Sequence, residues 1–121
     1  MPMKTGLLFL AALLYAGSAL PPLHAESITA QEAKKHVGEN ATVCGRIASE
    51  RKASNSKGQP TFINLDAAYP NQIFTALVWG EDRARVGELP GEGARLCVQG
   101  VIADYKGIPQ IVVRDKNQIT R

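Results

Sequence analysis

Two segments of this chain share one pattern, and each carries one of its two cysteines. Residues 41–48 read ATVCGRIA, and residues 94–103 read ARLCVQGVIA. In both, apolar side chains recur at the period of two that is typical of a β-strand with one buried face, and a glycine follows the cysteine. Two strands built alike indicate neighbours in one small β-barrel, which the rest of the chain must close.

The first 25 residues have the organisation of a secretory signal peptide. Lys4 gives a basic start, Leu7–Ala16 is an apolar run, and residues 17–23 contain Gly, Ser and two prolines that would break a helix. The apolar run is shorter than the roughly 20 residues of a membrane span. The sequence therefore predicts cleavage after Ala25, with an uncleaved anchor as the alternative. We expect an exported bacterial protein, periplasmic or secreted, without a membrane contact after cleavage.

The mature chain, residues 26–121, is expected to be a single domain. Such a small domain buries a modest core and is marginally stable without further support. Cys44 and Cys97 occupy equivalent positions of the two similar strands, so an exported chain with this even count predicts a disulfide between them. Two reduced thiols or a metal-binding pair are the alternatives. Because no CxxC motif or histidine cluster accompanies the cysteines, we expect no metal and no cofactor.

Short elements can be predicted around these strands. Thr29 and Glu32 have the spacing of a capping box ahead of a short helix that Gly38 ends. His36 lies in that helix without the partners of a catalytic or ligand site, which favours a surface position. The polar tail, residues 115–121, has one apolar anchor at Ile119.

The middle of the chain predicts the remaining strands. Residues 60–66 and 72–80 are expected strands, residues 81–86 a short helix, and residues 95–105 and 108–114 a hairpin that turns at Lys106-Gly107. In the first of these strands Ile63 and Leu65 should face inward and Phe62 and Asn64 outward. Residues 72–80 are apolar on both faces, so either Phe74 or Trp79 must point outward.

This order of elements indicates a mainly β fold of the OB type. Three strands, a short helix and a two-stranded hairpin give a five-stranded Greek-key barrel. The prediction includes a short N-terminal helix and a short helix between strands 3 and 4. In that topology the first strand pairs with the fourth, which would bring Cys44 next to Cys97.

Several short motifs across residues 41–119 carry a resemblance to a known family. They are TVCG at 42–45, SKGQPTF at 56–62, NL at 64–65, YPNQ at 69–72, VWG at 78–80, CV at 97–98 with Gly100, YKG at 105–107 and PQI at 109–111. On these motifs the chain resembles small exported bacterial proteins that carry an OB-fold nucleic-acid-binding domain, similar to the tRNA-anticodon-binding type. The resemblance covers residues 41–119 and implies an OB-type domain.

OB domains bind single strands across the outer face of strands 2 and 3, flanked by the loop after strand 1 and the loop between strands 4 and 5. Around the first loop, four cations and Glu50 give a local charge of +3, and Phe62 offers a ring on which a base could stack. The predicted nucleic-acid-binding residues are Arg46, Arg51, Lys52, Asn55, Lys57, Phe62, Asn64, Tyr105, Lys106 and Gln110.

Other functions remain open at the level of the sequence. Loss of Lys4 with the signal peptide lowers the formal charge from +3 to +2, and this mild charge with export favours a protein partner, a small anionic ligand or an envelope glycan. Exported nucleases with an OB barrel need a cluster of carboxylates and arginines. Here the acids Asp66, Glu81, Asp82, Asp104 and Asp115 are scattered. No zinc-binding helix, nucleophile elbow or phosphate loop is present, so the sequence predicts a non-enzymatic protein and leaves its oligomeric state open.

Overall fold

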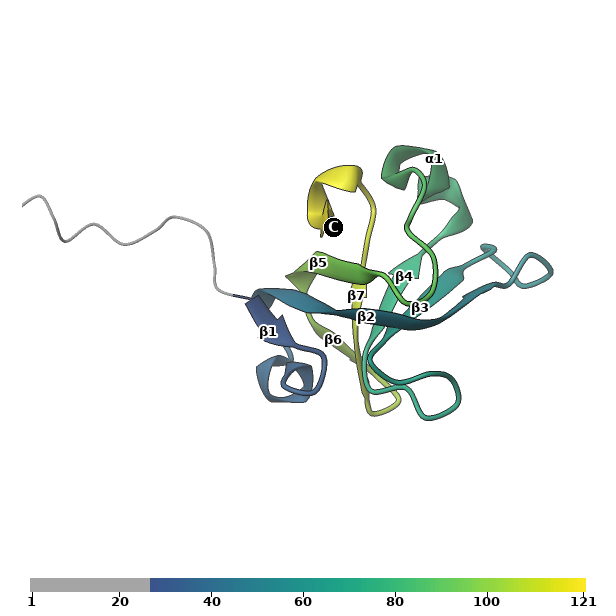
Figure 1. The fold of residues 1–121 in the computed structure, drawn as a ribbon. Coiled ribbons are helices and arrows are strands. Elements are labelled where there is room, and N and C mark those ends of the chain that lie inside the picture. The colour runs from purple at the N-terminus through teal and green to yellow at the C-terminus, as the bar shows by residue number, and fades with distance from the viewer. Residues whose placement is uncertain (1–26) are drawn as a thin grey trace, which may run out of the picture.

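A computed structural model describes residues 27–121, and the predicted signal peptide with its cleavage site after Ala25 lies outside the described residues. The strands are β1 (Ser27–Thr29), β2 (Asn40–Lys52), β3 (Thr61–Leu65), β4 (Thr75–Val78), β5 (Arg95–Val101), β6 (Ala103–Tyr105), β7 (Ile108–Val112) and β8 (Ile119–Thr120). The helices are α1 (Arg83–Val86) and the 3-10 helices η3 (Ala33–His36), η4 (Gly80–Asp82) and η5 (Lys116–Gln118) (Figure 1). None of the helices between residues 27 and 121 is long and apolar enough to cross a membrane.

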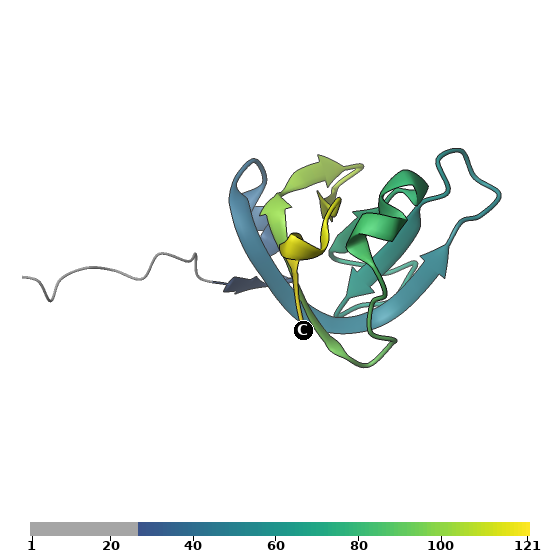
Figure 2. The same ribbon diagram turned by 90° about the horizontal axis from the view of Figure 1, so that it is seen from above.

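The long strand β2 connects the two halves of the sheet. Its first half pairs antiparallel with β5, from Asn40 opposite Val101 to Arg46 opposite Arg95. Its second half pairs antiparallel with β3 from Ile47 onward, with a bulge between Ile47 and Ser49. Figure 2 shows β2 as one arc that curves around the interior of the molecule. A bulge bends a strand and increases its twist, which lets one strand serve both neighbours.

The remaining pairings bring the sheet back towards β2. β3 pairs antiparallel with β4, β4 parallel with β7, and β7 antiparallel with β6. Ile102 alone separates β6 from β5. Its backbone leaves the ladder at this point: its N–H donates to the Glu39 carbonyl at 2.9 Å, and its carbonyl accepts from the Gly38 N–H at 2.7 Å. The side chain of Gln118 bridges β5 and β7, since its Nε2 donates to the carbonyls of Gln99 at 2.9 Å and Val112 at 3.1 Å. The predicted pairing of the first strand with the fourth is confirmed, since these strands are β2 and β5.

The core lies on the inner face of these strands. The predicted inward residues Ile63 and Leu65 are fully buried, as are Leu96, Val98 and Ile102. The structure also decides the orientation of β4. Phe74 is completely buried in the core, whereas Trp79 is half-buried on the other face. Burial of the phenylalanine ring leaves the indole, with its polar N–H, nearer the solvent.

The mainly β class is confirmed, but the predicted count of five strands is wrong. The described residues contain eight strands. Three changes explain the difference: β1 adds to β2 in parallel, Ile102 divides the predicted strand 95–105, and the tail contributes β8, which pairs with β5.

The helices also differ from the prediction. The N-terminal helix is a 3-10 turn that follows β1, and the helix between β4 and β5 consists of η4 and one turn of α1. The capping box is present, because the Thr29 N–H donates to Glu32 Oε1 at 2.9 Å and the Glu32 N–H donates to Thr29 Oγ1 at 3.1 Å. The bond from the Thr29 backbone N–H, followed by the bond from the Thr29 side chain, lowers the pKa of the Glu32 carboxyl. His36 lies at the surface, where its Nδ1 is 2.9 Å from Glu39 Oε1.

The disulfide prediction is confirmed. Cys44 lies directly opposite Cys97 in the β2–β5 ladder, and their sulfur atoms are bonded across a Cα–Cα distance of 4.0 Å. The crosslink joins residues 53 positions apart on the outer side of the sheet, away from the core cluster. A loop of this length corresponds to roughly 4 kcal/mol of stabilisation in the chain-entropy model.

Candidate nucleic-acid interface

The strand register sorts the predicted site residues into rows on the outer face of the sheet. Directly opposed residues of neighbouring strands point to the same face. Opposed positions across β2, β3, β4 and β7 form the Phe62 row, which consists of Arg51, Phe62, Leu77 and Val112. The next row on the same face is two residues further along each strand. We call it the Asn64 row, and it consists of Ser49, Asn64, Thr75, Gln110 and Ala103.

The Phe62 row combines an aromatic ring with a cation at the surface. The guanidinium carbon of the exposed Arg51 lies 5.2 Å from the centre of the Phe62 ring, within the range of a cation–π contact. Phe62 and Val112 are half-buried, and Leu77 between them is buried without belonging to the core cluster. Nucleic-acid bases stack on aromatic rings and on arginine guanidinium planes alike. In this row the guanidinium lies over the ring, so a base can stack on the outer face of the guanidinium or take its place on the ring.

The Asn64 row is not open in the way that the sequence predicted. Asn64 is only 4% exposed, because its Nδ2 donates to Ser49 Oγ at 3.0 Å and its Oδ1 accepts from Thr75 Oγ1 at 2.6 Å. The loop between β3 and β4 covers this place, since the Tyr69 backbone N–H also donates to Ser49 Oγ at 3.2 Å. Asn64 therefore lies on the outer face, as predicted, but it is covered and not exposed. Gln110, in the same row, is half-buried.

The loop between β2 and β3 is held against the end of β4. Gly58 packs on the indole of Trp79, where a Cβ at position 58 would lie 2.9 Å from two ring carbons. The Gly80 N–H donates to the Gly58 carbonyl at 2.8 Å, and Arg83 Nη2 donates to the Gln59 carbonyl. The predicted residues Asn55 and Lys57 lie in the exposed part of this anchored loop.

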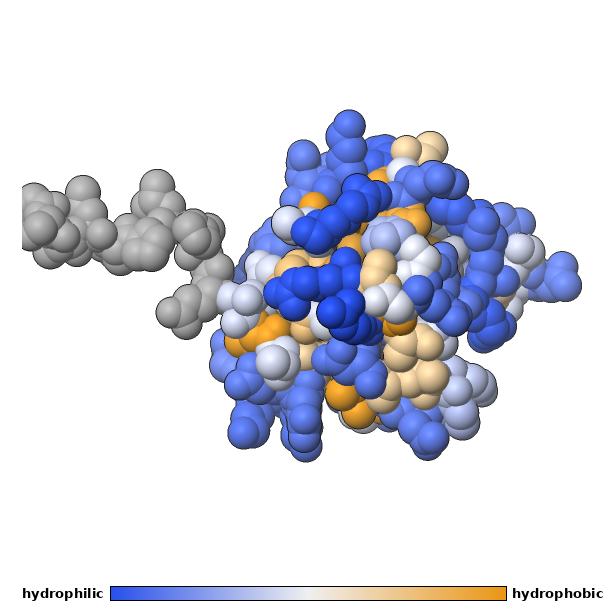
Figure 3. All heavy atoms as spheres, viewed as in Figure 1, coloured by the Kyte–Doolittle hydropathy of each residue, from blue (hydrophilic) through white to orange (hydrophobic). Residues whose placement is uncertain are grey.

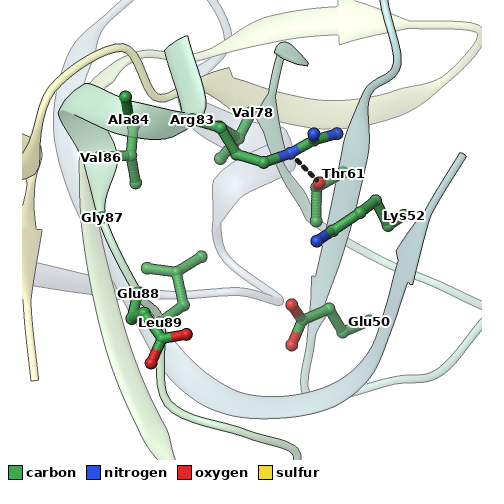
Figure 4. A pocket seen from close by; sticks show the side chains of 10 residues that line it. All are labelled: Glu50, Lys52, Thr61, Val78, Arg83, Ala84, Val86, Gly87, Glu88 and Leu89. Atoms are coloured by element: carbon green, nitrogen blue, oxygen red, sulfur yellow. Dashed lines mark hydrogen bonds between the residues drawn. The ribbon is translucent and has the colours of Figure 1, made fainter. Parts of the chain in front are cut away.

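Two predicted cations lie away from the Phe62 row. These cations are Lys52 and Arg46. Lys52 follows Arg51 in β2 and lies opposite Thr61, which faces the interior. Figure 4 shows Lys52 directed into a pocket that Arg83 and Thr61 also line. Arg46 lies on the β5 side of the bulge, where its Nη1 donates to the Gly93 carbonyl at 3.0 Å. The alternation of β2 thus separates Lys52 from Arg51.

The predicted residues Tyr105 and Lys106 lie at the turn between β6 and β7. Lys106 and Gly107 both have positive φ, as a tight hairpin turn of the I′ type requires. Tyr105 is 56% exposed, and Lys106 Nζ lies 5.3 Å from the centre of its ring. This second aromatic–cation pair lies at the end of the molecule that also carries the β3–β4 loop (Figure 1).

Tyr69 is an aromatic residue that the sequence reasoning did not place in the site. It lies in the β3–β4 loop and is 65% exposed. The sequence could have indicated this position, because Tyr69 precedes a proline in the turn between two predicted strands of the binding face. On the side seen in Figure 3, hydrophilic residues predominate and apolar areas are small. Within residues 27–121, the aromatic side chains among the exposed large hydrophobic residues are Tyr69 and Tyr105.

No metal centre is formed by the described residues, among which no group of three or more His, Cys, Asp or Glu side chains could hold an ion. Asp82, one of the acids considered for catalysis, is buried and paired with Arg85. The pair lies where η4 meets α1, and the buried Asp82 side chain does not face an open site.

Comparison with known proteins gives similarities in structure and none in sequence. No family model matches the chain, and no curated protein matches it. A solved structure of a putative aspartyl-tRNA synthetase from Leishmania major Friedlin is similar, with a TM-score of 0.53 and 14% identity. The match covers 82% of this chain but 21% of the other, so this chain spans about a fifth of that protein. The likeness is one of fold.

Proposed function

We propose that this protein is an exported, non-enzymatic OB-type module that binds single-stranded nucleic acid across the outer face of β3, β4 and β7. The observation that carries the proposal is the pairing of Arg51 on β2 with the half-buried Phe62 ring on β3, at the β2 side of that face. The order of strand pairing supports the OB assignment, because β2 pairs with β5 and β4 pairs in parallel with β7. The structural neighbour is, by its name, an enzyme that acts on tRNA.

A single strand suits this surface better than a duplex. Exposed bases can stack on rings at a gain of roughly 1–3 kcal/mol per base, whereas bases inside a duplex are not accessible to a flat sheet. Around the Phe62 row, Lys57 lies in the β2–β3 loop, and Lys106 lies in the β6–β7 turn beside Tyr105. These cations would contact phosphates at the two ends of the face. The disulfide supports export, since such bonds persist in oxidising compartments.

The proposal is tested by fluorescence anisotropy of labelled oligo-dT with the mature, oxidised protein at several salt concentrations. The logarithm of the binding constant should fall linearly with the logarithm of salt concentration. Phe62→Ala should weaken binding about 10-fold or more, because it removes a stacking surface. Arg51→Gln should weaken binding and reduce the salt slope by about 1, as the loss of one cation that neutralises a phosphate requires.

Lys52→Gln is the matched control, because it removes the same charge from the adjacent residue of β2 on the other side of the strand. It should affect oligo-dT binding less than Arg51→Gln does. Equal effects of the two variants, or no binding at low salt, would contradict the proposed interface.

The second candidate function is an exported OB-type module for a protein partner, a small anionic ligand or an envelope glycan. The mild net charge of +2 after loss of Lys4 favours it, because specific nucleic-acid binders usually carry a stronger basic surface. Failure of oligo-dT binding at low salt would favour this candidate.

A further inference from the structure

A pocket of about 400 Å³ lies between the end of β2 and the segment from α1 to Leu89. It is lined by Glu50, Lys52, Thr61, Val78, Arg83, Ala84, Val86, Gly87, Glu88 and Leu89. We call it the α1 pocket. Its volume falls within the range of small-molecule sites, which is roughly 300–1,000 Å³. It lies on the opposite side of β2 from Arg51, so it is separate from the proposed nucleic-acid face.

The α1 pocket has two charged ends. Lys52 and Arg83 lie beside the hydroxyl of Thr61, and this set is the cationic end (Figure 4). Glu50 and Glu88 lie at the acidic end, on opposite walls of the pocket, with Glu88 next to Leu89 and Glu50 next to Lys52 on β2. Two positive and two negative side chains leave the pocket neutral as a whole. The ion pairs within residues 27–121 are His36–Glu39 and Asp82–Arg85, so these four charged side chains are not paired with each other.

The floor of the pocket is apolar and its cationic end is held in place. Val78 and Val86 are buried in the core cluster, and Leu89 packs against that cluster from the pocket wall. Arg83 is positioned by two hydrogen bonds, since its Nε donates to Thr61 Oγ1 at 3.4 Å and its Nη2 donates to the Gln59 carbonyl. Thr61 is itself only 4% exposed. Preorganised polar groups above an apolar floor are typical of small-ligand sites.

We propose that the α1 pocket binds a small zwitterion with an apolar side chain, of the amino-acid or short-peptide class. Its carboxylate would lie at the cationic end, its ammonium group at the acidic end, and its side chain on the apolar floor. A free phosphate or a nucleotide fits less well, because the two glutamates would repel it. A purely apolar ligand would bury four charged groups without giving any of them a partner.

The test is a titration of the ¹⁵N-labelled, oxidised mature protein with L-leucine and L-leucyl-L-leucine, followed by ¹H–¹⁵N correlation spectra. Saturable shifts should concentrate at the residues that line the α1 pocket. N-acetyl-L-leucine lacks the ammonium group and L-leucinamide lacks the carboxylate. Each should bind about 10-fold more weakly than L-leucine, because one charged end of the pocket then has no partner.

Two variants make the test specific. Lys52→Gln should weaken the binding of the zwitterions about 10-fold, and the exposed position of Lys52 makes this variant compatible with the fold. Arg51→Gln should leave zwitterion binding unchanged, although it weakens oligo-dT binding. The proposal is overturned if neither zwitterion gives saturable shifts in the pocket, if the blocked probes bind equally well, or if Lys52→Gln has no effect. Because the two ligands depend on different cations, failure of one proposal is distinguishable from failure of the other.

Discussion

At the scale of single residues, Asn64 shows how a polar side chain in a strand can be committed to the fold. Its amide joins Ser49 on β2 to Thr75 on β4, and both bonds lie beneath the β3–β4 loop. Buried polar groups stabilise a fold when each finds a partner and cost free energy when one does not. Asn64 therefore links three adjacent strands through buried hydrogen bonds.

We predict that Asn64→Ala lowers the free energy of unfolding by about 1–3 kcal/mol, because the buried Thr75 hydroxyl loses its acceptor. Urea denaturation of the oxidised protein measures this change. The exposed Asn55→Ala is the matched control and should change stability by less than about 0.5 kcal/mol. An Asn64→Ala protein of unchanged stability but weaker oligo-dT binding would instead assign this amide to the ligand.

At the scale of secondary-structure elements, the C-terminal segment closes the sheet through one side chain. Gln118 Oε1 accepts from the backbone N–H groups of Arg114 and Asp115 at 2.7 and 3.2 Å. Its Nε2 donates to the carbonyls of Gln99 on β5 and Val112 on β7. Since β5 and β7 are not paired with each other directly, this amide takes the place of a ladder between them.

We predict that Gln118→Glu destabilises the protein by about 1–3 kcal/mol at neutral pH. One carboxylate oxygen can still accept from the Arg114 and Asp115 N–H groups. The other oxygen faces the carbonyls of Gln99 and Val112, which need a donor. Asn117→Asp makes the same chemical change at the neighbouring exposed residue and should have a small effect. Thermal unfolding at neutral and acidic pH measures the difference, which should shrink when the carboxyl group is protonated. Equal melting temperatures for the wild type and Gln118→Glu would show that the bridge is dispensable.

The elements that were predictable from the sequence are those with one buried face. Alternation placed the start of β2, placed β3, and correctly directed Ile63, Leu65, Leu96 and Val98 inward. It could not place the end of β2. Residues Ser49–Lys52 are polar and lack the apolar alternation that predicts a strand, and they form one because they pair with β3. The strand β8 has two residues, which is too short for a periodic pattern.

The candidate site was predictable only in part. Alternation correctly gave Phe62 an outward position, but it could not show that the β3–β4 loop covers Asn64. The sequence also treated Arg51 and Lys52 as one basic cluster. The two residues face opposite sides once β2 extends through both of them, and that extension depends on pairing with β3. Contacts between distant segments therefore decided which cations share a surface.

At the scale of the whole molecule, the two proposed binding surfaces lie on opposite sides of the second half of β2. The Phe62 row belongs to the outer face, and the α1 pocket opens beside the core on the other side. The disulfide is remote from both, because it joins the first half of β2 to β5. A change in the disulfide should therefore act on the stability of the domain and leave the chemistry of either surface intact.

We predict that Cys44→Ala combined with Cys97→Ala lowers the free energy of unfolding by about 2–5 kcal/mol, as expected for a crosslink that closes a long loop in a small domain. Urea denaturation of the oxidised wild type, the reduced wild type and the double variant measures the loss, and the last two should agree. At a temperature where the variant remains folded, its affinity for oligo-dT should match that of the oxidised wild type, because the Phe62 row lies on the β3–β4 part of the sheet. A folded variant that had lost oligo-dT binding would show instead that the crosslink shapes the binding face through the curvature of β2.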